Sequence, residues 1–219
     1  MKILDNINHT VREDLQDTMQ QGSRVSIAAA CFSIYAYQEL KKQLEEIAEL
    51  RFIFTSPTFV QENTPKERRE FYIPKLTREK SLYGTEFEVR LRNELTQKAL
   101  AKECADWVRR KVKFRSNVSG EQMPGFMTVG ESSYMPISGF TTVDLGCERG
   151  NNAYYPVQRT EAFENGRYFL SLFDEIWNDS SRLQDVTDII LQSISTAYRE
   201  NSPDFIYFFT LYNLSLIHI

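Results

Sequence analysis

Histidine and cysteine are scarce in this chain of 219 residues, which limits the chemistry it can perform. The two histidines, His9 and His218, lie close to the two ends of the sequence. The three cysteines, Cys31, Cys104 and Cys147, are far apart and have no CxxC spacing. Zinc sites and Cys–His catalytic pairs need such residues in closer or more regular patterns. The sequence therefore predicts no metal site and no cofactor, reduced cysteine thiols, and a solvent-facing His9 on an N-terminal helix.

The sequence also lacks a long apolar run and the phosphate-binding loop of nucleotide hydrolases. No stretch has the pattern of a signal peptide. No apolar run reaches the roughly 20 residues that a membrane-spanning helix needs. Glycine is never followed by lysine, so the motif GxxxxGKS or GxxxxGKT is absent. We therefore expect a cytoplasmic protein without membrane contact, and no ATP hydrolysis by this chain.

Positive charge is concentrated in one part of a chain whose formal net charge is −4. Residues 64–115 hold 15 Lys/Arg against 8 Asp/Glu, whereas the rest holds 11 against 22. A basic segment on an acidic body indicates a local anion-binding face. A solvated, charged helix explains the same pattern equally well.

Hydrophobic periodicity predicts an alternation of strands and helices in the first half of the chain. The run VSIAAACFSIY has no polar alternation, as in a central strand covered on both faces. Strand, helix and strand in succession favour a parallel pair with a right-handed crossover. The expected elements are a helix at 5–21, a strand at 23–35, a helix at 37–49, a strand at 50–54, a loop at 56–74 and a helix at 85–109.

The segment WVRRKVKFRS after that helix is the predicted basic cluster. In a short strand, Val112 and Phe114 would face one side and Lys111, Lys113 and Arg115 the other. Phosphate contacts need cations and little else, so this cluster is a candidate nucleic-acid contact. An edge strand protected by lysines against aggregation is the competing interpretation. The full set of candidate cations is Arg109, Arg110, Lys111, Lys113 and Arg115, with Arg68 and Arg69 from the preceding loop.

The second half of the chain is predicted to begin with a hairpin. Strands at 126–129 and 133–137 flank a turn at Gly130, and a loop rich in Ser, Gly and Thr follows at 138–142. Such loops present N–H groups and hydroxyls to phosphate in some proteins and are plain turns in others. After it we expect a strand at 154–157, a helix capped by Thr160 that carries Phe173 and Trp177, and a helix at 183–199.

The order of these elements resembles the phospholipase D-like domain at the N-terminus of bacterial SWI/SNF- and DEAD-type helicases. The segments that carry the resemblance are SRVSIAAACFSIYA, LRFIFTSPTF, LYGTEFEVRLRNEL, FDEIWND and SPDFIYFFTLYNL. In that superfamily an HxKxxxxD motif supplies a nucleophilic His and a phosphate-binding Lys, and a GSSNFT-like loop and an Asn-containing strand follow.

Matched to this pattern, the motif of the chain is degenerate. MPGFMTV places Pro124 at the His position and Phe126 at the Lys position. The loop at 136–142 keeps only Ser138 and the pair Phe140-Thr141, and Asn152 falls where the family has its Asn-containing strand. Proline cannot attack phosphorus and phenylalanine cannot neutralise phosphoryl oxygens. The degenerate motif positions are thus Pro124, Phe126, Ser138, Thr141 and Asn152, and we expect no catalytic residue.

The resemblance implies an α/β fold with a mixed sheet flanked by helices and a C-terminal helical extension. It divides the chain into a phospholipase D-like domain at 1–180, a helical connector to a helicase motor outside this sequence at 181–213, and a tail at 214–219. That tail, LSLIHI, looks like the translation of a transposase end sequence used in DNA sequencing libraries.

Three functions remain in order of preference. The first is a non-enzymatic accessory module of a DNA helicase that binds nucleic-acid phosphate, with DNA the expected partner, or regulates the motor. The second is a domain for docking or homodimerisation without nucleic-acid binding, since active members build one site from two copies of the motif. A nuclease or phosphodiesterase with a rearranged site is the least favoured.

Overall fold

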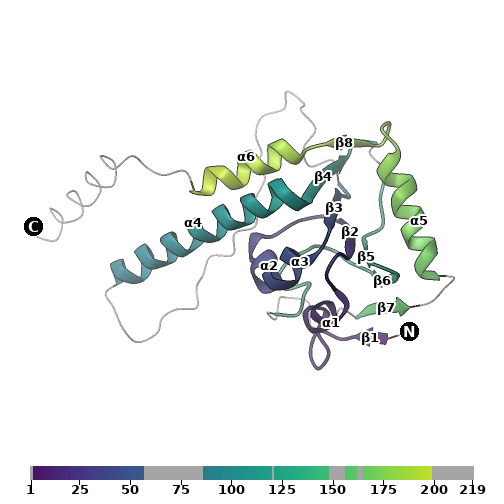
Figure 1. Ribbon diagram of the computed structural model, residues 1–219, viewed down its shortest axis with the longest axis horizontal. Coiled ribbons are helices and arrows are strands. Elements are labelled where there is room, and N and C mark those ends of the chain that lie inside the picture. Colours follow the sequence, from purple (N-terminus) through teal and green to yellow (C-terminus); the bar gives the residue numbers. More distant parts are fainter. Residues whose placement is uncertain (1, 57–85, 120, 148–155, 162–164, 199–219) are drawn as a thin grey trace, which may run out of the picture.

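One eight-stranded mixed sheet organises the computed structural model, which describes residues 2–56, 86–119, 121–147, 156–161 and 165–198 (Figure 1). The strand order is β1-β7-β6-β5-β2-β3-β4-β8. Strands β2, β3 and β4 are parallel to one another, and the other neighbouring pairs are antiparallel. The strands are β1 (Lys2–Leu4), β2 (Arg24–Ala29), β3 (Glu49–Phe54), β4 (Val112–Asn117), β5 (Phe126–Val129), β6 (Ser132–Met135), β7 (Val157–Glu161) and β8 (Leu183–Asp185).

Helices cover both faces of the sheet, which confirms the predicted α/β class with a mixed, helix-flanked sheet. Figure 1 shows α5 alone on one side and the other helices on the opposite side. We call these the α5 face and the α4 face. The helices are α1 (Val11–Thr18), α2 (Ile34–Glu39), α3 (Lys41–Glu46), α4 (Glu86–Lys111), α5 (Asn165–Asn178) and α6 (Thr187–Tyr198).

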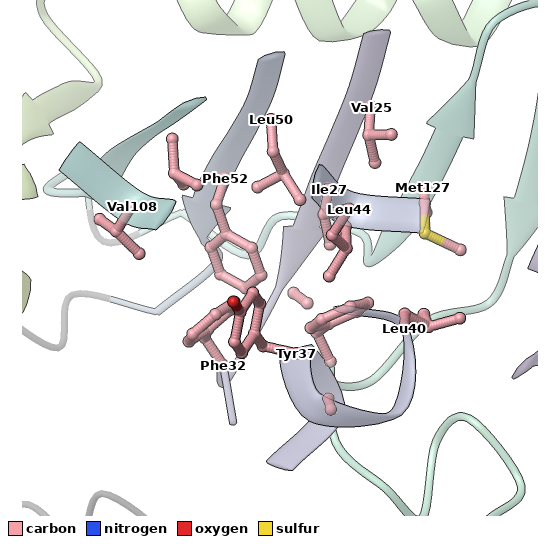
Figure 2. Close-up of a cluster of buried hydrophobic side chains, with 14 of the residues drawn as sticks. Val25, Ile27, Phe32, Tyr37, Leu40, Leu44, Leu50, Phe52, Val108 and Met127 are labelled. Carbon is pink, nitrogen blue, oxygen red and sulfur yellow. The ribbon is translucent and has the colours of Figure 1, made fainter. Parts of the chain in front are cut away.

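The α4 face carries the main hydrophobic core (Figure 2). Val25, Ile27 and Phe52 project from β2 and β3 towards Tyr37 and Leu44 of the covering helices, and all five are fully buried. Because side chains alternate along a strand, residues between them, such as Ala28 and Ile53, lie on the α5 face. The first half of the apolar run thus corresponds to a central strand covered on both faces, as predicted. The strand ends at Ala29, however, and not at residue 35, because α2 has already begun at Ile34.

The parallel pair of β2 and β3 is confirmed, but the helix expected at 37–49 is divided. Ser33 caps α2 by accepting the N–H of Tyr35. The helix ends at Glu39, because the φ of −116° and ψ of 14° at Leu40 leave the helical region. Leu40 is fully buried in the core. Two short helices therefore replace the continuous one.

The N-terminal helix is shorter than predicted because two side chains fix its start. Thr10 and Glu13 form a capping box, so the helix begins at Val11. Before it, the Asp5 carboxylate accepts the N–H groups of Ile7, Asn8 and His9 and holds them in a turn. His9 is exposed, as expected, but lies in this turn and not on the helix. Strand β1, which the sequence did not predict, precedes the turn.

A buried ionic network joins this N-terminal part to the sheet. The Asp14 side chain is only 1% exposed and accepts hydrogen bonds from Lys2 Nζ at 2.6 Å, Tyr134 Oη at 2.9 Å and Arg159 at 3.0 Å. Burial acts to raise the pKa of Asp14, but hydrogen bonds from Lys2 and Tyr134 and the charge of Arg159 hold it below its usual value. The network ties β1, α1, β6 and β7 together.

The later elements differ from the predictions mainly at their boundaries. The hairpin of β5 and β6 is present, whereas the strand expected at 154–157 runs from Val157 to Glu161. Thr160 lies within that strand, so it does not cap α5. The helix expected at 183–199 is preceded by β8, which pairs with the end of β4, and α6 then packs along α4. Among the described residues no helix is long and apolar enough to cross a membrane.

Candidate functional site

The position that the resemblance assigns to the phosphate-binding lysine is part of the protein interior. Phe126 begins β5 and is fully buried on the α5 face. Its ring lies 5.5 Å from that of Phe169 and 6.1 Å from that of Phe173, between ring centroids. Phe126 forms, with Ala28 and Ile53, the apolar surface of the sheet on which α5 packs. This side chain therefore serves packing, and a cation in the same place would lose its hydration.

Pro124, at the expected histidine position, is exposed and lines an open pocket of about 250 Å³. The pocket lies where the carboxyl end of β4 leads into β5 and faces the C-terminal half of α5. Its apolar lining comes from Met123, Pro124, Leu172 and Ile176. Of the positions that the resemblance assigns to the motif, Pro124 thus lines a concavity, whereas Phe126, Ser138 and Thr141 do not.

The charged groups around this pocket are mostly acidic. Glu121, Glu175 and Asp179 contribute three carboxylates against the single guanidinium of Arg182. Arg182 lies 3.1 Å from Asp179 and 3.6 Å from Glu121. Hydrogen bonds from Ser181 lower the pKa of Asp179, so this group stays ionised at neutral pH. An anionic phosphodiester would meet repulsion here, where an active site of this class needs cations.

The Ser/Gly/Thr loop after β6 uses its own polar groups internally. Phe140 donates its N–H to Cys31 O at 2.8 Å and accepts the N–H of Ser33 at 3.0 Å. Thr141 Oγ1 donates to the Asp144 carboxylate at 2.5 Å and accepts the Asp144 N–H at 3.2 Å. Backbone N–H groups of Gly139 and Thr141 also bond this carboxylate. The N–H groups of Gly139, Phe140 and Thr141 and the Thr141 hydroxyl are therefore satisfied within the chain.

Gly139 has a steric role in this loop. A Cβ at this position would lie 2.5 Å from Cys31 Sγ and 2.7 Å from Asp144 Oδ2. Ser138 is exposed beside it and Thr141 is half-buried. Asn152, the last of the degenerate motif positions, lies outside the described residues.

None of the cysteines has the properties of a reactive thiolate. Burial and the nearby charge of Asp144 raise the pKa of Cys31. Burial raises the pKa of Cys104 to about 12 and that of Cys147 to about 11. All three are free thiols. At neutral pH they stay protonated and are poor nucleophiles.

Three members of the predicted basic cluster bind groups of the protein itself. Arg109 pairs with Asp106 at 2.6 Å, and Arg110 pairs with Glu45 at 3.0 Å. Lys111 Nζ donates to the carbonyl oxygens of Glu45 at 2.5 Å and Ile47 at 2.6 Å. Arg110 and Lys111 thereby tie the C-terminal end of α4 to the end of α3.

The other two cations of the cluster lie on the α5 face. Arg115 lies over the Trp177 ring at 4.5 Å and donates to the Trp177 carbonyl. Lys113 is exposed and is the direct neighbour of Arg51 on β3. The row predicted from Lys111, Lys113 and Arg115 is therefore not continuous, because Lys111 is the last residue of α4 and not part of the strand. The strand β4 is also not a sheet edge, since β8 pairs with its second half.

Arg51 is a residue that the sequence analysis missed. It donates to Asp174 at 2.7 Å and Ser26 at 3.0 Å, and its guanidinium lies 5.0 Å from the Phe173 ring centroid. The sequence predicted a strand at 50–54, but only the register of the parallel strands places Arg51 beside Lys113. Arg68 and Arg69 lie outside the described residues.

Comparison with known proteins does not assign a family or a function to this site. No family model matches the sequence, and no curated protein matches it. Among the described residues there is also no group of three or more His, Cys, Asp or Glu side chains that could hold a metal ion.

Proposed function

We propose that this chain is a non-catalytic accessory domain of phospholipase D-like type that acts by docking. Its target is the motor of the larger helicase that the resemblance implies, or a second copy of the chain. One observation carries the proposal: where a catalytic member would hold its His and Lys, this chain has an exposed proline at an acidic pocket and a phenylalanine in the core.

The electrostatics of the pocket support this proposal. Phosphoryl transfer needs a nucleophile and preorganised positive charge at the oxygens that become more negative. The pocket offers three carboxylates and an arginine already paired to two of them. Binding a protein surface makes no such demand.

Nucleic-acid binding is the second candidate, and one observation favours it. The side chains of Arg109 and Arg110 remain 47% and 56% exposed despite their ion pairs. Exposed ion pairs are weak, on the order of 1 kcal/mol or less, so phosphate could compete for these cations. Such binding would fall steeply with salt because phosphate contacts release counterions.

Two assays test the proposal against its alternatives. The chain is incubated with bis(p-nitrophenyl) phosphate and with duplex DNA, and we expect no hydrolysis. Hydrolysis that disappears in the pocket variant Glu175→Gln would overturn the proposal and favour the hypothesis of a nuclease or phosphodiesterase. Sedimentation of the chain then separates the docking targets, because a monomer at high concentration removes the second copy as the target.

A DNA titration at two salt concentrations tests the second candidate. The variant R110Q/K113Q removes two exposed cations and keeps Lys111, whose ammonium binds backbone carbonyls. Salt-sensitive affinity that weakens in this variant would establish nucleic-acid binding. Equal affinity in variant and wild type would leave docking as the function.

A further inference from the structure

The pocket beside Pro124 combines two kinds of surface that select the same kind of ligand. Met123, Leu172 and Ile176 give it apolar walls, and each of them is only partly buried by the rest of the protein. Glu121 and Glu175 are exposed at its rim. An apolar wall below a carboxylate rim matches a side chain that has an aliphatic stem and a cationic end.

The charges of the rim are only partly compensated. Arg182 spans Asp179 and Glu121 at 3.1 and 3.6 Å. Within the part of the chain that the structure describes, Glu175 makes no ion pair and no side-chain hydrogen bond. With three carboxylates against one guanidinium the rim has a net charge of −2, and a second cation beside Glu175 and Glu121 would reduce it to −1.

The size of the pocket limits what can enter it. About 250 Å³ is below the roughly 300–1,000 Å³ of typical small-molecule sites. One or two side chains fit such a volume, whereas the phosphate of a nucleotide has the wrong charge for the acidic rim.

The geometry points to a docking site for a basic peptide segment of a partner protein, anchored by one arginine or lysine with an aliphatic neighbour. The cationic group lies between Glu175 and Glu121, and the aliphatic atoms lie on Leu172, Ile176 and Met123. This inference rests on the proposed docking function and names the surface and the chemistry of the partner.

The test uses the full chain, labelled with ¹⁵N, and three matched peptides. The probes are Ac-Leu-Arg-Leu-NH₂, Ac-Leu-Gln-Leu-NH₂ and Ac-Leu-Glu-Leu-NH₂. We expect the arginine peptide to shift the amide resonances of Glu121, Glu175 and Ile176 with a dissociation constant of about 1 mM. The glutamine peptide binds several-fold more weakly and the glutamate peptide does not bind.

Two variants with the same change in charge provide the control. Glu175→Gln lowers the affinity for the arginine peptide about threefold, as expected for one solvent-exposed ion pair. Glu131→Gln, in the turn between β5 and β6 at the opposite end of the strands, leaves it unchanged. Equal affinities for the three peptides, or equal losses in the two variants, would overturn the inference.

Other occupants of the pocket are distinguished by the same titration. Tighter binding of the arginine peptide by a K66Q/R68Q/R69Q variant would assign the pocket to the chain's own basic segment and overturn the assignment to a partner. Absence of peptide binding without phosphodiester hydrolysis would remove the pocket assignment and leave the docking function standing. Phosphodiester hydrolysis would remove the docking function whatever the peptides do.

Discussion

The two faces of the sheet are built differently. On the α4 face several helices cover a continuous apolar core. The buried carboxylate at its margin, Asp14, forms ion pairs with Lys2 and Arg159. On the α5 face one helix covers a small cluster, with hydroxyls such as those of Ser26 and Thr128 buried beside it. The α5 face also holds Phe126 and borders the pocket at Pro124. The α4 face therefore contributes most of the apolar packing, whereas the α5 face borders an open pocket.

The largest expected effect comes from placing a lysine at position 126 on the α5 face. Phe126→Lys removes a fully buried ring and places a charge in the cluster below α5. We expect a loss of about 5 kcal/mol in the free energy of unfolding, measured by urea denaturation. Phe126→Leu, the control, loses about 1–2 kcal/mol.

Pro124→His provides the matched comparison at the exposed position of the same motif. Its effect on stability stays within about 0.5 kcal/mol, as for most surface substitutions. If Phe126→Lys were as stable as the wild type, the side chain at 126 would reach solvent, and a phosphate-binding role at that position would again be possible.

Asp14→Asn tests the ionic network on the α4 face. The substitution leaves Lys2 and Arg159 without their buried carboxylate, so we expect a loss of about 3 kcal/mol. Asp174→Asn makes the same change on the α5 face, where the carboxylate side chain is 52% exposed, and costs about 0.5 kcal/mol. Both losses in the free energy of unfolding are measured by urea denaturation. Equal losses would contradict the inference that the carboxylate on the α4 face contributes more to stability than the one on the α5 face.

The same network predicts a dependence of stability on pH. The pKa of Asp14 is lowered in the folded chain, so its contribution is present above the unfolded-state value of about 3.9 and is lost as pH falls through the folded-state pKa. The stability difference between wild type and Asp14→Asn should therefore narrow on going from neutral pH to about pH 3. If the difference in the free energy of unfolding stays the same over this range, the pKa of the Asp14 carboxyl is not lowered in the way we infer.

Lys111→Met tests whether the basic cluster has a structural role. The ammonium donates to two carbonyl oxygens at the end of α3, so its removal should cost about 1.5 kcal/mol in urea denaturation. Arg109→Gln, which removes an exposed ion pair, should cost about 0.5 kcal/mol or less. If Arg109→Gln cost more stability than Lys111→Met, Lys111 would again be a candidate phosphate ligand.

Thr128→Val should have a small effect of the opposite sign. Within the described structure the Thr128 hydroxyl is buried on the α5 face without a hydrogen-bond partner. Valine has the same shape and removes that unsatisfied group, so we expect a gain of about 1 kcal/mol. Destabilisation in thermal or urea unfolding would show that the hydroxyl has a partner in solution, such as a bound water molecule.

Much of the fold could be predicted because local patterns dominate it. The run VSIAAACFSIY indicated a strand buried on both faces, and Gly130 between two short predicted strands indicated the hairpin. Strand β1 was missed because its three residues are held by pairing with β7, which lies more than 150 residues away in sequence. The division at Leu40 depends on tertiary packing and leaves no local signal.

The site was less predictable than the fold. The sequence alone shows the proline at 124 and the phenylalanine at 126, but the acidic rim combines Glu121 with Glu175 and Asp179 across more than 50 residues. Alternation predicted a cationic face on β4 correctly for Lys113 and Arg115. It failed for Lys111, because the helix continues to that residue and turns its side chain towards α3.

One titration tests most directly whether the pocket at Pro124 rejects phosphate. The ¹⁵N-labelled chain is titrated with inorganic phosphate and with a thymidine dinucleotide while the amide resonances of Glu121, Met123 and Glu175 are followed. The acidic rim predicts that neither ligand shifts these resonances at low salt. Saturable shifts confined to these residues would show that the pocket binds phosphate, and would contradict the account of this chain as a docking domain.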